Sequence, residues 1–283
     1  MPSPKDDRVF TWTHGLGAFI VPFLVAAFVL WLVPSHTDWF AWTIHPRMTP
    51  MIMGAGYVSG AYFFTRVVLA KRWHEIHLGF LPITAFTLFM AIATARHLDK
   101  FAHDRVAFWI WSVLYVITPI LVPATWLWNR QTDTCAIGPG DVEIPRRIRS
   151  ILLAAGAVQL LVALILLVLP ATMIDVWPWT LTPLTAGILG GWFALPGVVA
   201  VMMGIDGRWS AVRITLHSQL IGLGLILLGV ARGWGDFDHS SVVTYIFAIG
   251  IAALFAGLAV LWWCMHGLER EHGLHEQATT APA

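Results

Sequence analysis

Eight long apolar runs dominate this chain and limit what it can fold into. An α-helix needs about 20 residues to cross about 30 Å of hydrocarbon, and each run is close to this length. The short strands of alternating hydrophobicity that are typical of outer-membrane barrels do not occur in the sequence. We therefore predict an all-α, polytopic membrane protein with eight transmembrane helices. The runs lie at about residues 15–34, 51–70, 76–95, 106–128, 150–170, 182–204, 214–231 and 242–265.

The composition supports a chain whose main partner is the lipid bilayer. It is 58% hydrophobic and 12% charged, whereas an ordinary soluble domain is about 25% charged. A soluble protein of 283 residues has too little interior to hold so many apolar side chains. No basic surface of the kind that binds nucleic acid is evident.

The distribution of Lys and Arg predicts the orientation, because cytoplasmic loops carry an excess of these residues. The larger set lies on the side of both termini, which we therefore expect in the cytoplasm of a cell whose plasma membrane holds the protein. The larger set is Lys5, Arg8, Lys71, Arg72, Arg130, Arg146, Arg147, Arg149, Arg208, Arg213 and Arg270. The smaller set, on the opposite side, is Arg47, Arg96, Lys100, Arg105 and Arg232.

The two halves of the chain share a pattern of residues. Trp42-Thr43-Ile44-His45-Pro46 resembles Trp179-Thr180-Leu181-Thr182-Pro183. At one constant offset, Arg72-Trp73, Ala95-Arg96, Phe101 and His103 recur as Arg208-Trp209, Ala231-Arg232, Phe237 and His239. Each half contains four spans, and four is even, so both copies enter the membrane from the same side. The pattern predicts two tandem, parallel four-helix repeats related by an axis along the membrane normal.

The repeat sets the expected domain boundaries. Residues 1–128 form the first four-span repeat, residues 129–149 a cytoplasmic linker and residues 150–270 the second repeat. Residues 271–283 are expected to form a disordered C-terminal tail. Gly56 with Gly60, and Gly187 with Gly191, form GxxxG pairs. Such pairs let helix backbones approach closely in a bilayer, so we expect the second and sixth spans to pack near the internal axis.

The loops on the outer side carry the polar and aromatic residues best suited to bind a ligand. We predict an outward-facing pocket, able to hold an anionic headgroup, a small acid or a metal ion. The alternative is that each arginine forms a local ion pair, Arg96 with Asp99 and Arg232 with Asp236. The spacing matches no specific metal site. The predicted pocket residues are Asp38, Trp42, His45, Arg96, Asp99, His103, Asp175, Trp179, Arg232, Asp236 and His239.

Inside the predicted spans the sequence is poor in charge. No acidic residue lies deep in a span, which argues against a proton-coupled or cation-driven pump. His14, His77 and His217 lie toward the cytoplasmic half, where two of them would be able to bind haem b axially. The alternative is that each ring is hydrogen-bonded to a neighbouring carbonyl or hydroxyl. We predict no cofactor, with haem b as the alternative.

These observations favour a transporter, permease or lipid-handling protein for a neutral or amphipathic small molecule. One alternative is an accessory or assembly subunit of a membrane complex, with membrane-protein partners or as a homo-oligomer. A second alternative is a haem- or quinone-dependent membrane redox protein. The sequence contains no Walker motif, HExxH motif or nucleophile elbow, so it suggests no catalytic residues.

Overall fold

The computed structural model describes residues 5–138 and 140–280, with side chains as far as residue 272. These residues form ten α-helices, five short 3-10 helices and no β-strand. The α-helices are α1 (Thr11–Ala27), α2 (Val29–Leu32), α3 (Met48–Leu69), α4 (Phe80–Arg96), α5 (Val106–Asn129), α6 (Arg146–Val168), α7 (Pro170–Ile174), α8 (Pro183–Asp206), α9 (Trp209–Arg232) and α10 (Val242–Thr280). The 3-10 helices are η1 (Trp73–Glu75), η2 (His77–Gly79), η3 (Leu98–Lys100), η4 (Arg130–Thr132) and η5 (Trp234–Asp236).

Eight helical segments are long and apolar enough to cross a membrane. This confirms the predicted all-α class and the predicted number of spans, and it is the pattern of a multi-pass membrane protein. The segments lie within a few residues of the apolar runs. They are Thr11–Leu32, Met48–Leu69, His77–Arg96, Val106–Thr132, Arg146–Val168, Pro183–Asp206, Trp209–Arg232 and Val242–His272.

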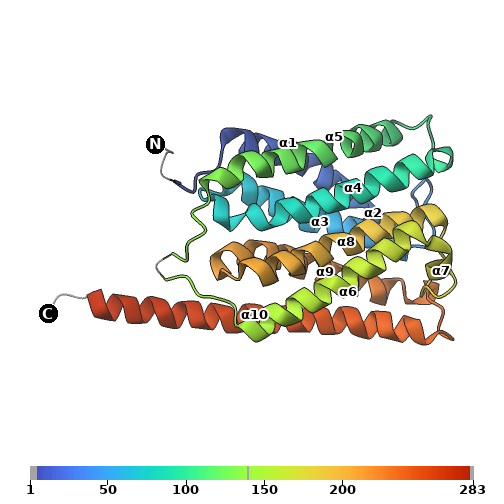
Figure 1. The fold of residues 1–283 in the computed structure, drawn as a ribbon. Helices are drawn as coiled ribbons and strands as arrows, with labels where there is room; N and C mark the ends of the chain where they lie inside the picture. The colour runs from blue at the N-terminus through green and yellow to red at the C-terminus, as the bar shows by residue number, and fades with distance from the viewer. Residues whose placement is uncertain (1–4, 139, 281–283) are drawn as a thin grey trace.

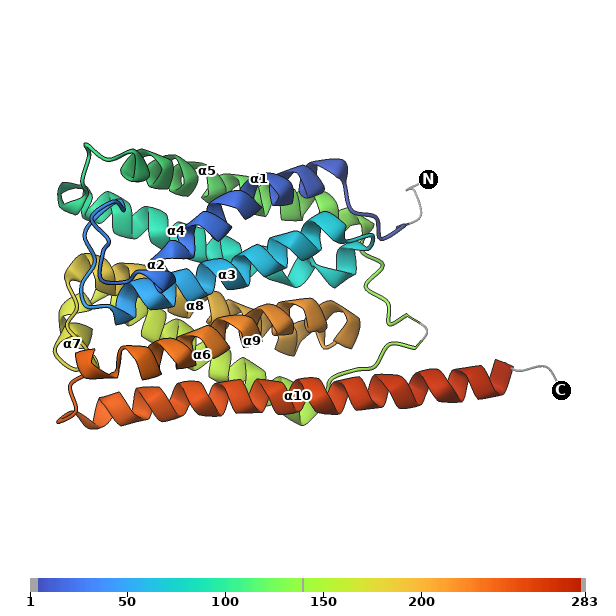
Figure 2. The ribbon, with the colours of Figure 1, turned by 180° about the vertical axis from the view of Figure 1, so that it is seen from behind.

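The long helices form an elongated bundle with both described ends of the chain at the same end of it (Figures 1 and 2). Within the first half, α1 packs on α3 and α4 packs on α5; within the second, α6 packs on α8 and α9 packs on α10. Across the halves, α3 packs on α9 and α4 packs on α8. The same pairing scheme therefore occurs in both halves, and α3 and α8 meet in the middle.

Local sequence explains how α8 begins and ends. The side chain of Thr182 accepts a hydrogen bond from the backbone N–H of Thr185, and the Thr185 hydroxyl accepts one from the backbone N–H of Thr182. Pro183 occupies the first helical position. The helix ends at Gly207, whose φ of 74° is costly for any residue with a Cβ atom. Gly207 also lets the chain turn directly into α9.

Glycines allow close helix contacts in the middle of the bundle. A Cβ atom at Gly56 of α3 would overlap the ring of Trp192 of α8, and one at Gly156 of α6 would lie 2.7 Å from the carbonyl oxygen of Gly197. Of the predicted GxxxG glycines, Gly56 allows the contact between α3 and α8, whereas Gly187 and Gly191 of α8 lie against Ala93 and Met90 of α4. The second and sixth spans thus contact each other inside the bundle.

The last helix differs from the expectation. Residues from 271 were expected to form a disordered tail, but α10 continues to Thr280 and projects beyond the bundle (Figure 2). After Arg270 proline first occurs at Pro282, so no proline interrupts the helix as far as Thr280, although Gly273 disfavours it. Residues 281–283 of the expected tail lie outside the described residues.

Candidate functional site

The outer tryptophans are packing residues in two matching aromatic clusters. Trp42 is 4% exposed, and its ring centroid lies 5.2 Å from that of Phe101. Trp179 is 2% exposed and lies 5.3 Å from Phe237. Each cluster is completed by two further aromatic residues, Phe40 and Trp111 in the first and Trp177 and Phe247 in the second. Both tryptophans are therefore too deeply packed to line an open pocket.

The two outer arginines bind the ends of helices from the opposite half. Arg96 donates from Nη1 to the carbonyl oxygen of Leu167 at 2.6 Å, near the end of α6. Arg232 donates to the carbonyl oxygens of Trp31 and Leu32, at 2.8 and 2.9 Å, at the end of α2. Carbonyls at a helix C-terminus lack partners and carry partial negative charge, so a guanidinium stabilises them.

The local ion pairs considered for these arginines do not form in the described structure. Asp99 pairs with Lys100 at 2.8 Å, and this neighbour holds the pKa of Asp99 below its usual value. Asp236 binds Arg47 through both carboxylate oxygens, and it also accepts a hydrogen bond from the Arg47 backbone N–H. The Asp236 hydrogen bonds raise the pKa of Arg47. Asp99 and Asp236 therefore neutralise Lys100 and Arg47, and not Arg96 and Arg232.

The remaining predicted pocket residues are exposed in loops between the helices. Asp38 accepts a hydrogen bond from Thr43 at 3.1 Å. His103 contacts the carbonyl oxygen of Leu98 through Nε2 at 2.9 Å. His45, Asp175 and His239 are also exposed. The structure does not gather the predicted set into one pocket, and none of its members lines either of the two hollows described below.

The three intramembrane histidines do not fit a haem ligand set. His77 faces the carbonyl oxygen of His74 through Nδ1 and a carboxylate oxygen of Asp206 through Nε2. His217 faces the hydroxyl of Tyr62 through Nδ1 and accepts the Trp262 indole N–H at Nε2. An iron ligand needs a free ring nitrogen, and both nitrogens are engaged in each ring.

The third histidine offers no pair for a bis-histidine site. His14 contacts the carbonyl oxygen of Ala70 through Nε2 at 3.0 Å. Its only possible partners, His77 and His217, are both hydrogen-bonded at each nitrogen. No group of three or more His, Cys, Asp or Glu side chains suited to a metal ion occurs in the part of the chain that the structure describes. We derive no redox step from these residues.

The first-half helices surround a hollow of about 260 Å³, which we call the apolar hollow. It lies between α1, α3, α4 and α5 and is closed on one side by Trp192 of α8. No charged residue lines it. Its hydroxyls are all engaged: those of Tyr57 and Tyr115 lie 3.2 Å apart, and those of Thr87 and Thr118 donate to carbonyls of their own helices. The hollow therefore suits an uncharged, largely apolar occupant.

A groove on the lipid-facing side adjoins the apolar hollow. It has a volume of about 360 Å³ and lies between α1 and α5. Groove and hollow share five lining residues, so only these side chains lie between them. They are Ile20, Phe23, Ile110, Leu114 and Thr118. The hollow is therefore next to a surface that faces lipid and not water.

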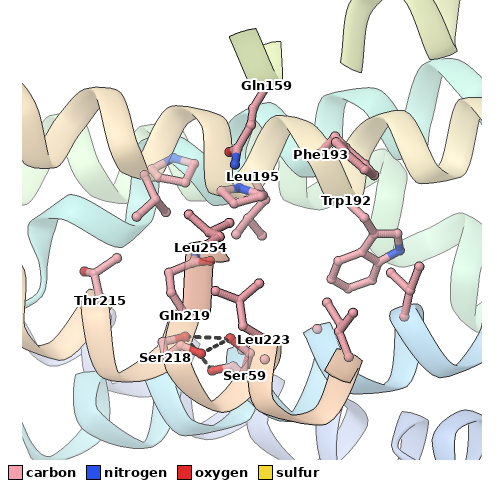
Figure 3. A pocket seen from close by; sticks show the side chains of 18 of the residues that line it. Ser59, Gln159, Trp192, Phe193, Leu195, Thr215, Ser218, Gln219, Leu223 and Leu254 are labelled. Carbon is pink, nitrogen blue, oxygen red and sulfur yellow. Dashed lines mark hydrogen bonds between the residues drawn. The ribbon is translucent and has the colours of Figure 1, made fainter. Parts of the chain in front are cut away.

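The second-half helices surround another hollow, of about 120 Å³, which we call the polar hollow. It lies between α3, α6, α8, α9 and α10 (Figure 3). On one wall Ser59 and Ser218 exchange hydrogen bonds, each hydroxyl donating to the other residue's carbonyl oxygen, at 2.6 and 2.8 Å. On the other wall Gln159 directs its amide from α6 toward the hollow (Figure 3). Its Oε1 atom is buried and has no hydrogen-bond partner among the described residues.

The two hollows occupy corresponding places in the two halves. At the offset of 136 residues seen in the sequence pattern, Tyr57 of the apolar hollow corresponds to Phe193 of the polar hollow, and Thr118 corresponds to Leu254 in the same way. At the same offset Gly56 corresponds to Trp192. The Trp192 ring separates the hollows and packs against Tyr57, with ring centroids 5.1 Å apart. The lining residues were not among those selected from the sequence. Only the Gly56 and Gly60 pair, predicted to pack near the middle of the bundle, pointed to this region.

At the end of the bundle where the termini lie, a buried ion network joins the linker to α8 and α9. The guanidinium of Arg208, 6% exposed, binds both oxygens of Asp133 at 3.1 Å and both oxygens of Asp206 at 2.8 Å. Burial alone would raise the pKa of Asp133, but the hydrogen bonds from Arg208 and from the Cys135 backbone N–H, together with the positive charge of Arg208, outweigh it and hold that pKa below its usual value. The hydrogen bonds with Asp206, followed by those with Asp133, raise the pKa of Arg208. The network stabilises this end of the bundle.

In comparisons with known proteins, no family model, no curated protein and no solved structure matches this chain.

Proposed function

We propose that this chain is a lipid-handling or permease-type membrane protein that takes a neutral or amphipathic molecule from the bilayer into the apolar hollow. The observation that carries the proposal is the groove between α1 and α5, which adjoins that hollow and shares five lining residues with it, so that small side-chain movements would open a path from lipid. A soluble substrate would need a path from water, whereas this path opens to lipid. The binding site thus lies inside the bundle and not at the outer loops.

The lining of the path defines the class of molecule. No charged side chain lines the groove or the hollow, so a charged group there would lose its hydration without gaining a counter-ion. The hydroxyls that line the hollow already have partners, so an apolar chain leaves none of them unsatisfied. An acyl or isoprenoid chain fits these requirements, and any charged headgroup would remain in the groove mouth or at the membrane surface.

We further propose that the two halves are parallel repeats with both termini in the cytoplasm. Reciprocal contacts support the repeat: Arg96 binds the carbonyl oxygen of Leu167, and Arg232 binds that of Trp31, which is the same position in the other half. The pairing of α3 with α9 and of α4 with α8 is reciprocal in the same way. The excess of Lys and Arg at the end that holds both termini supports the orientation.

The test is to block the junction of groove and hollow. Leu114 is half-buried and lines both, whereas Leu127 of the same helix is 47% exposed and lines neither. We expect native mass spectrometry of protein released from lipid nanodiscs to show a tightly held lipid molecule in the wild type and in Leu127→Trp. Leu114→Trp should lose that molecule, because its indole occupies the path.

Two readouts make the outcome decisive. Size-exclusion chromatography shows whether both variants fold, and equal lipid retention by two folded variants would refute the proposed site. Vesicles that contain the protein and a nitrobenzoxadiazole-labelled phosphatidylcholine then separate transport from binding. If the protein moves lipid between leaflets, dithionite will bleach more of the label in wild-type and Leu127→Trp vesicles than in Leu114→Trp vesicles.

A further inference from the structure

We infer that the polar hollow is a second binding site, selective for the hydroxyl or amide group of an uncharged amphiphile. Its walls are apolar except for a few hydrogen-bonding groups, of which Gln159 is unsatisfied. The inference rests on Gln159 and Thr215, which line the polar hollow and not the apolar one, and it does not require that the apolar hollow bind anything.

The unpartnered oxygen of Gln159 is the central observation. A buried polar group without a hydrogen bond costs free energy, and in hydrocarbon no solvent relieves that cost. Native structures rarely leave such an atom unpaired, so a partner absent from the protein itself is expected. The Oε1 atom is an acceptor only, and the partner must therefore donate an O–H or N–H group.

Other polar groups mark the same hollow. Thr215 lines it and is 3% exposed, and its Oγ1 atom also has no partner among the described residues. Gln219 lines it as well, at the position where the first half has Ile83. Because Ser59 and Ser218 satisfy each other, they fasten α3 to α9 and leave the amide of Gln159 as the main group for recognition.

The shape of the hollow indicates how an amphiphile would sit. Gln159 on α6 and Ile251 and Leu254 on α10 are only half-buried, so the hollow is reached between these two helices. A volume of about 120 Å³ holds a headgroup of a few heavy atoms but not a long chain. The hydroxyl or amide end therefore enters, and the chain stays in the lipid between α6 and α10. No charged residue lines the hollow, which excludes a charged headgroup.

A pair of probes that differ in one group tests this inference. 1-Decanol donates a hydrogen bond, whereas 1-chlorodecane has the same chain and no donor. Both compete with tritiated 1-decanol for protein in nanodiscs in a scintillation proximity assay, with concentrations referred to the lipid phase. We expect wild-type protein to bind 1-decanol about tenfold more tightly than 1-chlorodecane. This ratio is the size expected for one hydrogen bond to a buried acceptor.

The variants separate recognition from folding. Gln159→Leu removes the acceptor and should abolish the preference, while its stability is unchanged or raised because an unsatisfied buried group is lost. Gln131→Leu, at an exposed position in η4, is the matched control and should keep the preference. Leu114→Trp should also keep it, since this variant alters only the apolar hollow.

Two results would overturn the inference. Equal competition by both probes in the wild type would mean that water alone satisfies Gln159. A preference that persists in folded Gln159→Leu would place alcohol recognition elsewhere. If Leu114→Trp loses lipid retention while Gln159→Leu keeps its alcohol preference, the proposed function stands and this inference fails.

Discussion

Replacing Arg208 should destabilise this protein far more than replacing Arg72, its counterpart 136 residues earlier. Arg208 is 6% exposed and forms four hydrogen bonds to two carboxylates. Arg72 is exposed, and its side chain forms no hydrogen bond or ion pair with the described residues. The two positions share the residue type and the place in the repeat pattern, so they differ mainly in burial and partners.

The magnitude follows from what Arg208→Ala leaves behind. Removing one partner of a buried ion pair costs about 3–5 kcal/mol, because the remaining charge is buried without compensation. Here two carboxylates remain, those of Asp133 and Asp206, which raises the cost. A hollow of about 520 Å³ beside the network gives water access to them, which lowers it. We therefore expect a loss of about 3 kcal/mol for Arg208→Ala and less than about 0.5 kcal/mol for Arg72→Ala.

The assay is reversible unfolding in mixed detergent–SDS micelles, followed by circular dichroism. The free energy of unfolding of Arg208→Lys should lie between those of the wild type and Arg208→Ala. The lysine ammonium keeps the charge but lacks the planar guanidinium that binds two carboxylates at once. Equal free energies of unfolding for Arg208→Ala and Arg72→Ala would refute the reasoning. The network would then be a surface feature whose charges are fully hydrated in the native state.

Three further predictions test packing, pH dependence and orientation. Gly56→Ala should lower the free energy of unfolding by about 1–3 kcal/mol, because the new methyl group must displace the Trp192 ring. The control Gly15→Ala has no heavy atom near the new methyl group and should not lower it. Similar unfolding curves for the two variants would contradict this. The lowered pKa of Asp133 means that its contribution to stability is present above the unfolded-state pKa of about 3.9 and is lost as pH falls through the folded-state pKa. The melting temperature should therefore drop below about pH 4 in the wild type, and by less in Asp133→Asn, in which Asp206 alone still loses its pairing with Arg208. With the other cysteine replaced by serine, exposed Cys135 should react with a membrane-impermeant maleimide in inside-out vesicles and not in intact cells; labelling of intact cells would reverse the orientation.

Span number and position could be predicted from the sequence because each depends on a local property. An apolar run of the right length has to form a helix in lipid, since an unpaired backbone group is too costly there. The eight runs accordingly match the eight helical segments to within a few residues. The end of α10 was less predictable. Whether a short polar stretch continues a helix depends on weak propensities, and after Arg270 good helix formers such as Glu276 and Gln277 alternate with poor ones such as Gly273 and Thr279.

The partners of the outer charges could not be predicted in the same way. Sequence proximity suggests pairs such as Arg232 with Asp236, four residues apart, but the fold brings other groups closer. Arg232 reaches the free carbonyls at the end of α2, and Asp236 reaches Arg47, 189 residues away in the chain. Such contacts depend on how the two halves dock. Tryptophans near span ends are likewise ambiguous, since Trp42 and Trp179 are consistent with either a pocket wall or a packed cluster until the neighbouring helices are placed.

The docking of the halves also makes the two hollows different. The Trp192 ring occupies the space that a side chain at Gly56 would need, and these two residues hold corresponding positions. Large side chains at both positions would overlap at the contact between α3 and α8. One half therefore has the Trp192 ring and the other has Gly56, which leaves space for that ring. The ring then closes one side of the apolar hollow and narrows the polar hollow. A symmetric pair of sites is therefore sterically excluded at this contact, and a variant that tests one hollow must avoid the residues that line both, such as Gly56 and Trp192. Each hollow needs its own ligand and its own control, which is why the tests above use Leu114 for one and Gln159 for the other.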